Sequence, residues 1–227
     1  MNPVFISCRV YDSVLKLLKS FYADPVLIPD LSKIDSRTAY HADISLCVLG
    51  DTVVCAPSLY EKIDRIDNFN IIKGESEPHE PYPNDVLYNA AVVGKYIFCN
   101  LTATDRILVD IAKKNGFSLI NVKQGYARCS TLPVTDSALI TSDKGIYSAA
   151  FNLGLDVLLV SNEDILLEGY PNGFIGGTGG VFENRMFFCG DITQHRDFEK
   201  IKEFCGKYSV EIVYTSEPLR DFGSILC

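Results

Sequence analysis

The segment Asn89-Ala90-Ala91-Val92-Val93-Gly94-Lys95-Tyr96-Ile97-Phe98-Cys99 is the most informative part of the sequence for the fold, because its pattern recurs along the whole chain. Two short apolar runs flank the turn residues Gly94 and Lys95, and the second run ends in a cysteine. Apolar, β-branched and aromatic residues on both sides of a tight turn predict a β-hairpin. The same pattern predicts further hairpins at residues 45–55, 130–140 and 179–189.

Each hairpin is followed by a helical pattern and then by a third apolar strand. After the quoted hairpin, residues 103–115 predict a helix that Gly116 ends, and residues 118–122 predict the strand. The other helix–strand pairs are expected at 58–66 with 69–72, at 143–152 with 156–160, and at 195–205 with 210–214. Equivalent positions recur at similar intervals, with 44 residues from Cys55 to Cys99, 41 more to Ile140 and 49 more to Cys189. Such regular spacing indicates a repeat architecture.

The fifth unit is divided between the two ends of the chain. Residues 4–8, 11–22 and 26–28 predict its second strand, its helix and its third strand, and residues 223–227 predict its first strand. Pairing the N- and C-terminal strands would leave no open edge in the ring. We therefore expect a single α/β domain over residues 1–227, a five-bladed α/β-propeller of strand–strand–helix–strand units.

A doubly wound α/β sheet is the competing interpretation, since helices alternate with strands. In that fold, single parallel strands alternate with helices, without an antiparallel hairpin in every unit. A propeller of the WD type would have four strands in each blade and no regular helix. The recurring hairpin with its helix favours the five-unit ring over both.

The composition excludes several classes of partner. A net charge of −8 argues against nucleic acid, which needs clustered lysine and arginine, and mildly favours a cationic small molecule. We expect no membrane span, because no apolar run approaches the roughly eighteen residues that one needs. Eight cysteines spread along a chain without an export signal predict reduced thiols and a cytoplasmic location. Three scattered histidines without Cys-x-x-Cys pairs predict no metal site, and we expect no cofactor.

Cys129 and His41 are the candidate catalytic residues. Four cysteines share one place in the repeat, the end of the second hairpin strand, which predicts core positions; they are Cys8, Cys55, Cys99 and Cys189. Cys129 instead precedes a first strand, beside Arg128, whose charge would help to hold a thiolate. His41 and Asp43 begin another first strand, where period-two alternation places them on one face. Because the entries of first strands point toward the centre of a ring, a Cys nucleophile and a His acid/base can meet there.

These segments resemble the pentein superfamily, which includes arginine deiminase, dimethylarginine dimethylaminohydrolase, agmatine deiminase and the amidinotransferases. His41-Ala42-Asp43 looks like the His-x-Asp motif of that superfamily, and residues 125–133 resemble the segment around the nucleophilic Cys of arginine deiminases. The Cys unit lies two units beyond the His unit, as in those enzymes, so the chain order would be a circular permutation. Residues 124–145 and 173–177 are similar to a small bacterial group of pentein-like proteins that carries no assigned activity.

The resemblance implies attack of the Cys129 thiolate on the central carbon of a guanidino or amidine compound. His41 would protonate the leaving amine and then activate water or an acceptor amine. Side chains near the strand entries would bind the planar cation, and a carboxylate among them would accept two parallel hydrogen bonds from it. The candidate substrate-binding residues are Asp43, Asn84, Asp85, Arg128 and Asp221.

One unit departs from the superfamily's pattern. It offers the glycine-rich run 173–180 where a substrate-binding acid is expected. Glycine there would let a ligand approach the backbone closely. A noncatalytic ring used for binding, as in the ribosome-associated members of the superfamily, is therefore the alternative function.

Overall fold

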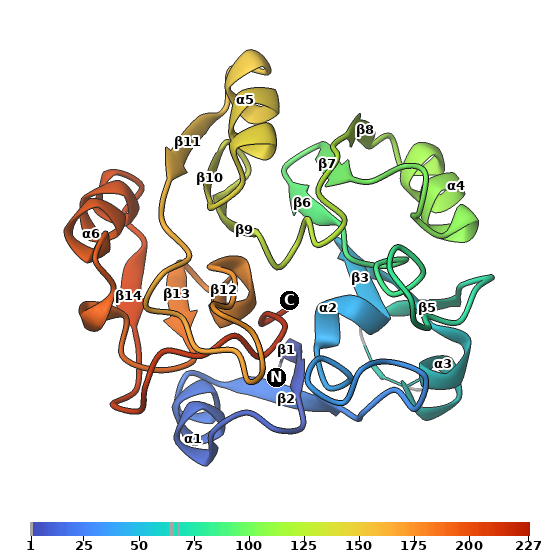
Figure 1. Cartoon of the computed structure of the whole chain (residues 1–227), viewed down its shortest axis with the longest axis horizontal. Coiled ribbons are helices and arrows are strands. Elements are labelled where there is room, and N and C mark those ends of the chain that lie inside the picture. The colour runs from blue at the N-terminus through green and yellow to red at the C-terminus, as the bar shows by residue number, and fades with distance from the viewer. Residues whose placement is uncertain (1, 64–65, 68) are drawn as a thin grey trace.

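A computed structural model describes residues 2–63, 66, 67 and 69–227. Five small β-sheets, each with its own helix, are arranged around a common centre (Figure 1). In each of the four three-stranded sheets, the first two strands pair antiparallel and the second pairs parallel with the third. This order, a hairpin followed by a helical crossover, confirms the predicted five-bladed α/β-propeller.

The four complete units follow one another along the chain. The unit that contains His41 comprises α2 (Ala42–Ser45), β3 (Leu46–Leu49), β4 (Thr52–Cys55), α3 (Pro57–Ile63) and β5 (Asn70–Lys73). The next comprises β6 (Ala91–Val93), β7 (Tyr96–Cys99), α4 (Arg106–Lys114) and β8 (Ser118–Asn121). The third comprises β9 (Thr131–Thr135), β10 (Ala138–Thr141), α5 (Lys144–Asn152) and β11 (Asp156–Leu159). The fourth comprises η1 (Gly176–Thr178), β12 (Gly179–Phe182), β13 (Arg185–Phe188), η2 (Ile192–Gln194), α6 (Phe198–Lys207) and β14 (Glu211–Val213). Residues 64 and 65, within the helix predicted at 58–66, lie outside the described residues.

The fifth unit joins the two ends of the chain. Strand β1 (Asn2–Ser7) pairs parallel with β2 (Ala23–Ile28), and α1 (Asp12–Ser20) connects them. The C-terminal segment adds one antiparallel bridge, in which the N–H groups of Phe5 and Leu226 donate to each other's carbonyls at 2.8 and 3.0 Å. The predicted pairing of the ends is confirmed, although residues 223–227 form a bridge and not a full strand. Figure 1 shows the C-terminus near the centre of the ring, and the bridge between Phe5 and Leu226 places β1 beside it.

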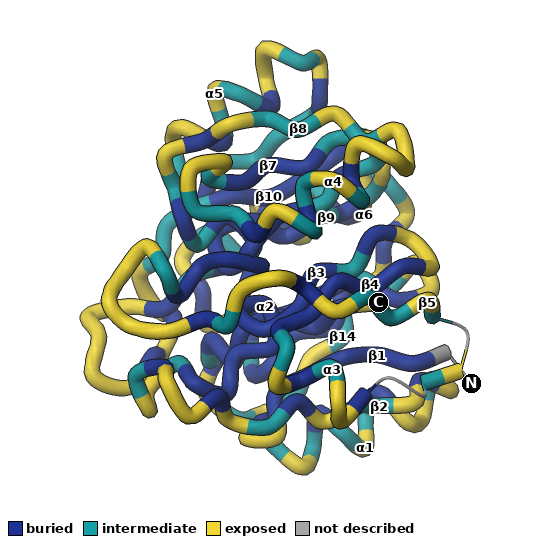
Figure 2. The backbone as a smooth tube through the Cα atoms, turned by 90° about the vertical axis from the view of Figure 1, so that its right-hand side faces the viewer, coloured by how far each residue is buried: buried dark blue, intermediate teal, exposed yellow. Residues whose placement is uncertain are grey.

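The strands form the core, and the helices and outer loops carry most of the exposed backbone (Figure 2). Cys55, Cys99 and Cys189 are fully buried, as predicted for their shared place in the repeat. Cys8 is exposed, because it follows the last residue of β1 and its thiol lies 3.7 Å from Asp30 at the surface. The prediction of a core position for Cys8 is therefore wrong. Within the described residues, none of the helices is both long and apolar enough to span a bilayer.

The segment around His41 differs from the expected strand entry. His41 precedes the short helix α2, and Asp43 lies within it, so alternation along a strand is not what brings the two together. The C-terminal segment holds this helix, because the N–H of Asp43 donates to the carbonyl of Gly223 at 3.1 Å. Gly223 has a φ of +76°, and a Cβ there would lie 2.2 Å from that of His41. Only glycine allows this close approach.

Candidate active site

A pocket of about 210 Å³ is lined by residues from several units of the ring. Its inner end is formed by three buried side chains, those of His41, Cys129 and Asp221. They come from three different units of the propeller, so only the closed ring brings them together. The two predicted catalytic residues and one predicted substrate-binding acid thus face the same space.

The thiol of Cys129 is held between a carboxylate and an amide. Its Sγ donates to Oδ2 of Asp43 at 3.0 Å and accepts from Nδ2 of Asn89 at 3.1 Å. The Oδ1 atom of Asn89 accepts the N–H groups of Arg128 and Cys129 at 2.7 and 3.3 Å. Burial, and then the charge of Asp43, raise the pKa of the Cys129 thiol well above its ordinary value, whereas the bond from Asn89 lowers it. The resting thiol is therefore protonated at neutral pH.

Asp43 links the thiol to the C-terminal segment. Its Oδ2 accepts hydrogen bonds from Cys129 and, at 2.5 Å, from the hydroxyl of Ser224. Its Oδ1 is buried and has no hydrogen-bond partner among the described residues. Burial raises the pKa of Asp43, and His41 opposes this increase. An unpartnered carboxylate oxygen in a buried site is costly, which makes it a ready acceptor for a ligand's N–H groups.

The His41 imidazole lies beside the second buried carboxylate. Its Nδ1 is 3.7 Å from Oδ1 of Asp221, and its Nε2 is buried without a hydrogen-bond partner in the described part of the chain. Burial lowers the pKa of His41 to about 4, although the charge of Asp43 acts in the opposite direction. The ring is therefore neutral at neutral pH and able to accept a proton.

Asp221 is cradled by the glycine-rich run that carries no acid of its own. Its Oδ2 accepts the N–H of Phe174 and its Oδ1 that of Gly223, each at 2.9 Å. A Cβ on Gly177 would lie 1.9 Å from Oδ1, so a larger residue there would displace the carboxylate. Burial raises the pKa of Asp221 to about 6, against the lowering effect of these two bonds. The glycine-rich run itself contains no acid, and the carboxylate that lies against it comes from Asp221, in the next unit along the chain.

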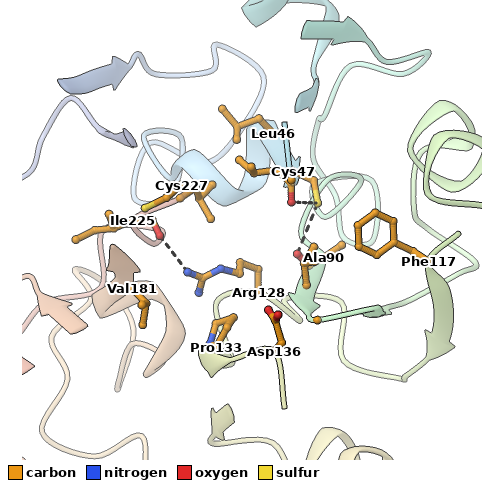
Figure 3. A pocket seen from close by; sticks show the side chains of 15 residues that line it. Leu46, Cys47, Ala90, Phe117, Arg128, Pro133, Asp136, Val181, Ile225 and Cys227 are labelled. Atoms are coloured by element: carbon orange, nitrogen blue, oxygen red, sulfur yellow. Dashed lines mark hydrogen bonds between the residues drawn. The ribbon is translucent and has the colours of Figure 1, made fainter. Parts of the chain in front are cut away.

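Arg128 lies away from the pocket that contains His41. Its guanidinium donates to the carbonyls of Thr131, Gly176, Gly179 and Ile225 at 2.8 to 3.3 Å. It lines a second pocket, of about 300 Å³, together with the hairpin turns at Gly50 and Gly94 (Figure 3). The side chain joins three units of the ring through backbone carbonyls. Arg128 therefore does not line the pocket with His41, although its charge lowers the pKa of Asp221.

Asn84 and Asp85 do not line the pocket with His41 either. The Nδ2 of Asn84 donates to the carbonyl of Pro81 within its own loop, at 2.9 Å. Asp85 accepts the hydroxyl of Tyr126 at 2.5 Å, and Tyr126 does line the pocket. Asp85 therefore does not line the pocket itself. It orients Tyr126, which forms part of the pocket's aromatic wall.

Asn89 and Ser224 are site residues that the sequence did not reveal. Asn89 contacts the thiol directly and Ser224 contacts Asp43. Asn89 lies two residues before the first strand of its unit, as Cys129 does in its own, and this equivalence is the signal that could have identified it. Ser224 carries no comparable signal, because its contact depends on how the C-terminal segment crosses the ring.

His41, Asp43 and Cys129 could also hold a metal ion. One donor atom from each lies within 4.8 Å of the other two. An imidazole nitrogen, a carboxylate oxygen and a thiolate are all ligands that Zn²⁺ accepts. The geometry therefore permits a metal where the sequence predicts none.

Comparison with solved structures identifies the fold. One similar structure is that of a mutant of dimethylarginine dimethylaminohydrolase (DDAH) from Pseudomonas aeruginosa, complexed with citrulline. The two sequences are 9% identical, and the structures match with a TM-score of 0.60 over 95% of this chain and 92% of that one. The amidinotransferase SxtG of Microseira wollei is 7% identical with a TM-score of 0.57, over 95% and 89%. ArgZ, an arginine dihydrolase from cyanobacteria, is 10% identical with a TM-score of 0.57, over 94% and 36%. At these identities the similarity shows the fold, that of the pentein superfamily.

Sequence comparison gives the family. A search of curated proteins finds no match. The model of a family described as of unknown function, DUF6873, matches residues 5–226. The chain therefore belongs to the DUF6873 family and has a pentein fold.

Proposed function

We propose that this protein modifies a guanidinium or amidinium group, as a hydrolase or transferase, through a covalent bond to Cys129. One observation carries the proposal: the thiol, the His41 imidazole and the Asp221 carboxylate line one pocket, and the buried Asp43 carboxylate contacts the thiol. Carboxylates recognise planar cations of this kind by paired N–H···O bonds. The structures of similar fold are of enzymes named for guanidino compounds, which supports the same class of substrate.

The charge of the substrate would activate the nucleophile. Without a ligand, burial and the neighbouring carboxylates keep the thiol protonated. A cation bound between Asp43 and Asp221 offsets the charges that disfavour a thiolate. The thiol proton can then pass to His41, whose Nε2 has no other hydrogen-bond partner among the described residues. The nucleophile therefore forms only when a substrate is present.

The reaction balances without an oxidant or a reductant. The Cys129 sulfur bonds to the central carbon of the cation, and a C–N bond then breaks as His41 gives its proton to the departing nitrogen, which leaves as ammonia or an amine. The remaining group is bound to the sulfur as a thiouronium. His41 next takes a proton from water or an acceptor amine, which attacks the same carbon. The C–S bond then breaks, His41 returns its proton to the sulfur to restore the resting thiol, and the hydrolysis product releases its remaining extra proton to solvent.

A pair of electrophiles tests the proposal on the intact protein. Chloroacetamidine is cationic, and chloroacetamide is its neutral counterpart of nearly the same shape. We expect the amidine to alkylate Cys129 at least tenfold faster than the amide, and the exposed Cys8 to show no such preference, with each site followed by peptide mass spectrometry. Equal rates of the two reagents at Cys129 would overturn the proposal. The Cys129→Ser variant should show no turnover of a guanidine.

A noncatalytic ring that binds a cation is the second candidate. It is favoured by the resting site, in which the thiol is protonated and the imidazole neutral. Calorimetry and an assay for released ammonia or amine separate the two. Tight binding of a guanidine without release, and without a covalent adduct, would support the binding ring.

A further inference from the structure

The pocket that contains Cys129 has two ends of different character. The reactive groups at its inner end are buried, whereas Tyr170, Pro171 and Asn172 at its outer end are exposed. A guanidinium held at the inner end would therefore direct the rest of the molecule past these outer residues. The chemistry of these outer residues therefore determines which substituent on the guanidinium the pocket accepts; this substituent is called the tail below.

The wall between the two ends is apolar and aromatic. It includes Leu167, Tyr126 and Phe174, and the rings of Tyr126 and Phe174 stack with centroids 6.2 Å apart and planes 27° apart. The hydroxyl of Tyr126 is already bound to Asp85, so this ring presents mainly its apolar face. Apolar groups gain free energy in proportion to the area that such a wall removes from water.

The lining provides no cation for an anionic tail. Among the described residues that line this pocket, none is a lysine or an arginine. Arg37 lies just beyond, over the Tyr170 ring at 4.7 Å, but it is paired with Asp35 and donates to the carbonyl of Gly169. A carboxylate that loses its water here would gain no charged partner, which is strongly unfavourable.

The charges around the mouth act in the same direction. Burial is the largest cause of the raised pKa of Tyr170, and the charge of Asp35 is the second. The charges of Asp85 and Glu80 also raise this pKa, whereas the charge of Arg37 lowers it. The carboxylates that act on Tyr170 at the outer end therefore outnumber the one guanidinium, which is itself paired with Asp35. Their field repels a carboxylate.

We infer that the pocket selects guanidines with an apolar tail and without a carboxylate, and that it rejects α-amino acids such as arginine; this inference rests on the proposed function. Butylguanidine represents the selected class, since it keeps the guanidinium and the alkyl chain. Arginine adds both charges of an amino acid to a similar chain. Agmatine adds an ammonium alone.

Protection of Cys129 from chloroacetamidine measures the preference on the unmodified protein. Butylguanidine should protect at a concentration at least tenfold lower than arginine, and agmatine, which lacks the carboxylate, should also protect at a lower concentration than arginine. Protection by arginine at the same or a lower concentration than butylguanidine would overturn the inference while leaving the proposed function intact. Failure of every guanidine, including guanidinium itself, would instead overturn the proposed function and the inference with it.

A gain-of-function variant provides the second test. Asn172→Arg places a guanidinium at the exposed outer end of the pocket, and Asn152→Arg adds the same charge at the exposed end of α5, outside the pocket lining. We expect Asn172→Arg to improve protection by arginine at least fivefold relative to guanidinium. The Asn152→Arg control should leave this ratio unchanged. An equal improvement in both variants would show a general charge effect and overturn the argument from the lining.

Discussion

The Cys129 sulfur lies 3.0 Å from Oδ2 of Asp43, although 86 residues separate them in the chain. This contact joins the hairpin unit of β9 to the unit that begins with α2. It makes the carboxylate both the acceptor of the thiol proton and a cause of the raised thiol pKa. The consequences of this arrangement can be measured one residue at a time.

Asn89→Ala should raise the pKa of the Cys129 thiol, because the bond from the Asn89 amide lowers it. One neutral hydrogen bond is worth about 1 kcal/mol, so the pH profile of Cys129 alkylation should shift upward by about half to one unit. Asn84→Ala is the matched control, since Asn84 bonds only within its loop. A profile that is the same in Asn89→Ala as in the unmodified protein would contradict the assigned role.

Binding of a guanidine should strengthen as the pH rises through about 6, because the pKa of Asp221 is raised to about 6 and only its charged form attracts a cation. His41, with a pKa near 4, should add no step in this range. Calorimetric affinities from about pH 5 to 8 give the measurement. Asp221→Asn should bind more weakly and lose the step; a step that persists in this variant would assign the titration to another group.

Gly177→Ala should displace the Asp221 carboxylate, because the added Cβ would lie 1.9 Å from its Oδ1. We expect a loss of about 1–3 kcal/mol in the free energy of unfolding, as for other overpacked sites, together with weaker guanidine binding. Gly206→Ala is the control, since a Cβ there has no atom within 4 Å and α6 gains helix propensity. Unchanged stability and binding in Gly177→Ala would refute this reading of the glycine-rich run.

We propose that residues 1–227 form one domain whose units unfold together, with Arg128 as a central tie. Arg128→Met removes four buried hydrogen bonds from a charged donor, and in the described part of the chain only the carbonyls of Gly176 and Gly179 are seen to keep a donor, from Ser224 and Ile225, so it should cost about 3 kcal/mol or more. Arg106→Met, which removes an exposed pair with Glu75, should have a much smaller effect. Denaturant unfolding should show one transition in each protein; separate transitions would contradict a single domain.

Chelators should leave guanidine turnover unchanged, because the proposed steps use only protein groups. Added Zn²⁺ should inhibit turnover. His41, Asp43 and Cys129 have donor atoms within 4.8 Å of one another, and a bound metal would coordinate the thiolate and block its attack on the substrate. Turnover and chloroacetamidine labelling should fall together as Zn²⁺ is added. Turnover that chelation abolishes and a metal restores would instead assign a metal-dependent reaction.

The ring could be predicted from local signals in the sequence. Hairpin turns such as Gly94-Lys95, the apolar runs beside them and the helix that follows are local signals, and their regular recurrence reports the repeat. Cys129 and His41 could also be recognised as candidates. The repeat shows which residue type is usual at each position of a unit, so a residue that departs from it can be identified. The helical turn at α2 was missed, since four residues are too few to show a periodic pattern.

Which side chains meet at the site depends on the tertiary fold. Asn89, Ser224 and Asp221 reach the thiol or its partners across units, and Arg128 turns instead toward four carbonyls in the neighbouring pocket. Hydrogen bonds of this kind depend on how distant segments cross, to within a fraction of an ångström, and no local pattern records that geometry. The fold follows from repeated local chemistry, whereas the candidate site follows from closing the ring.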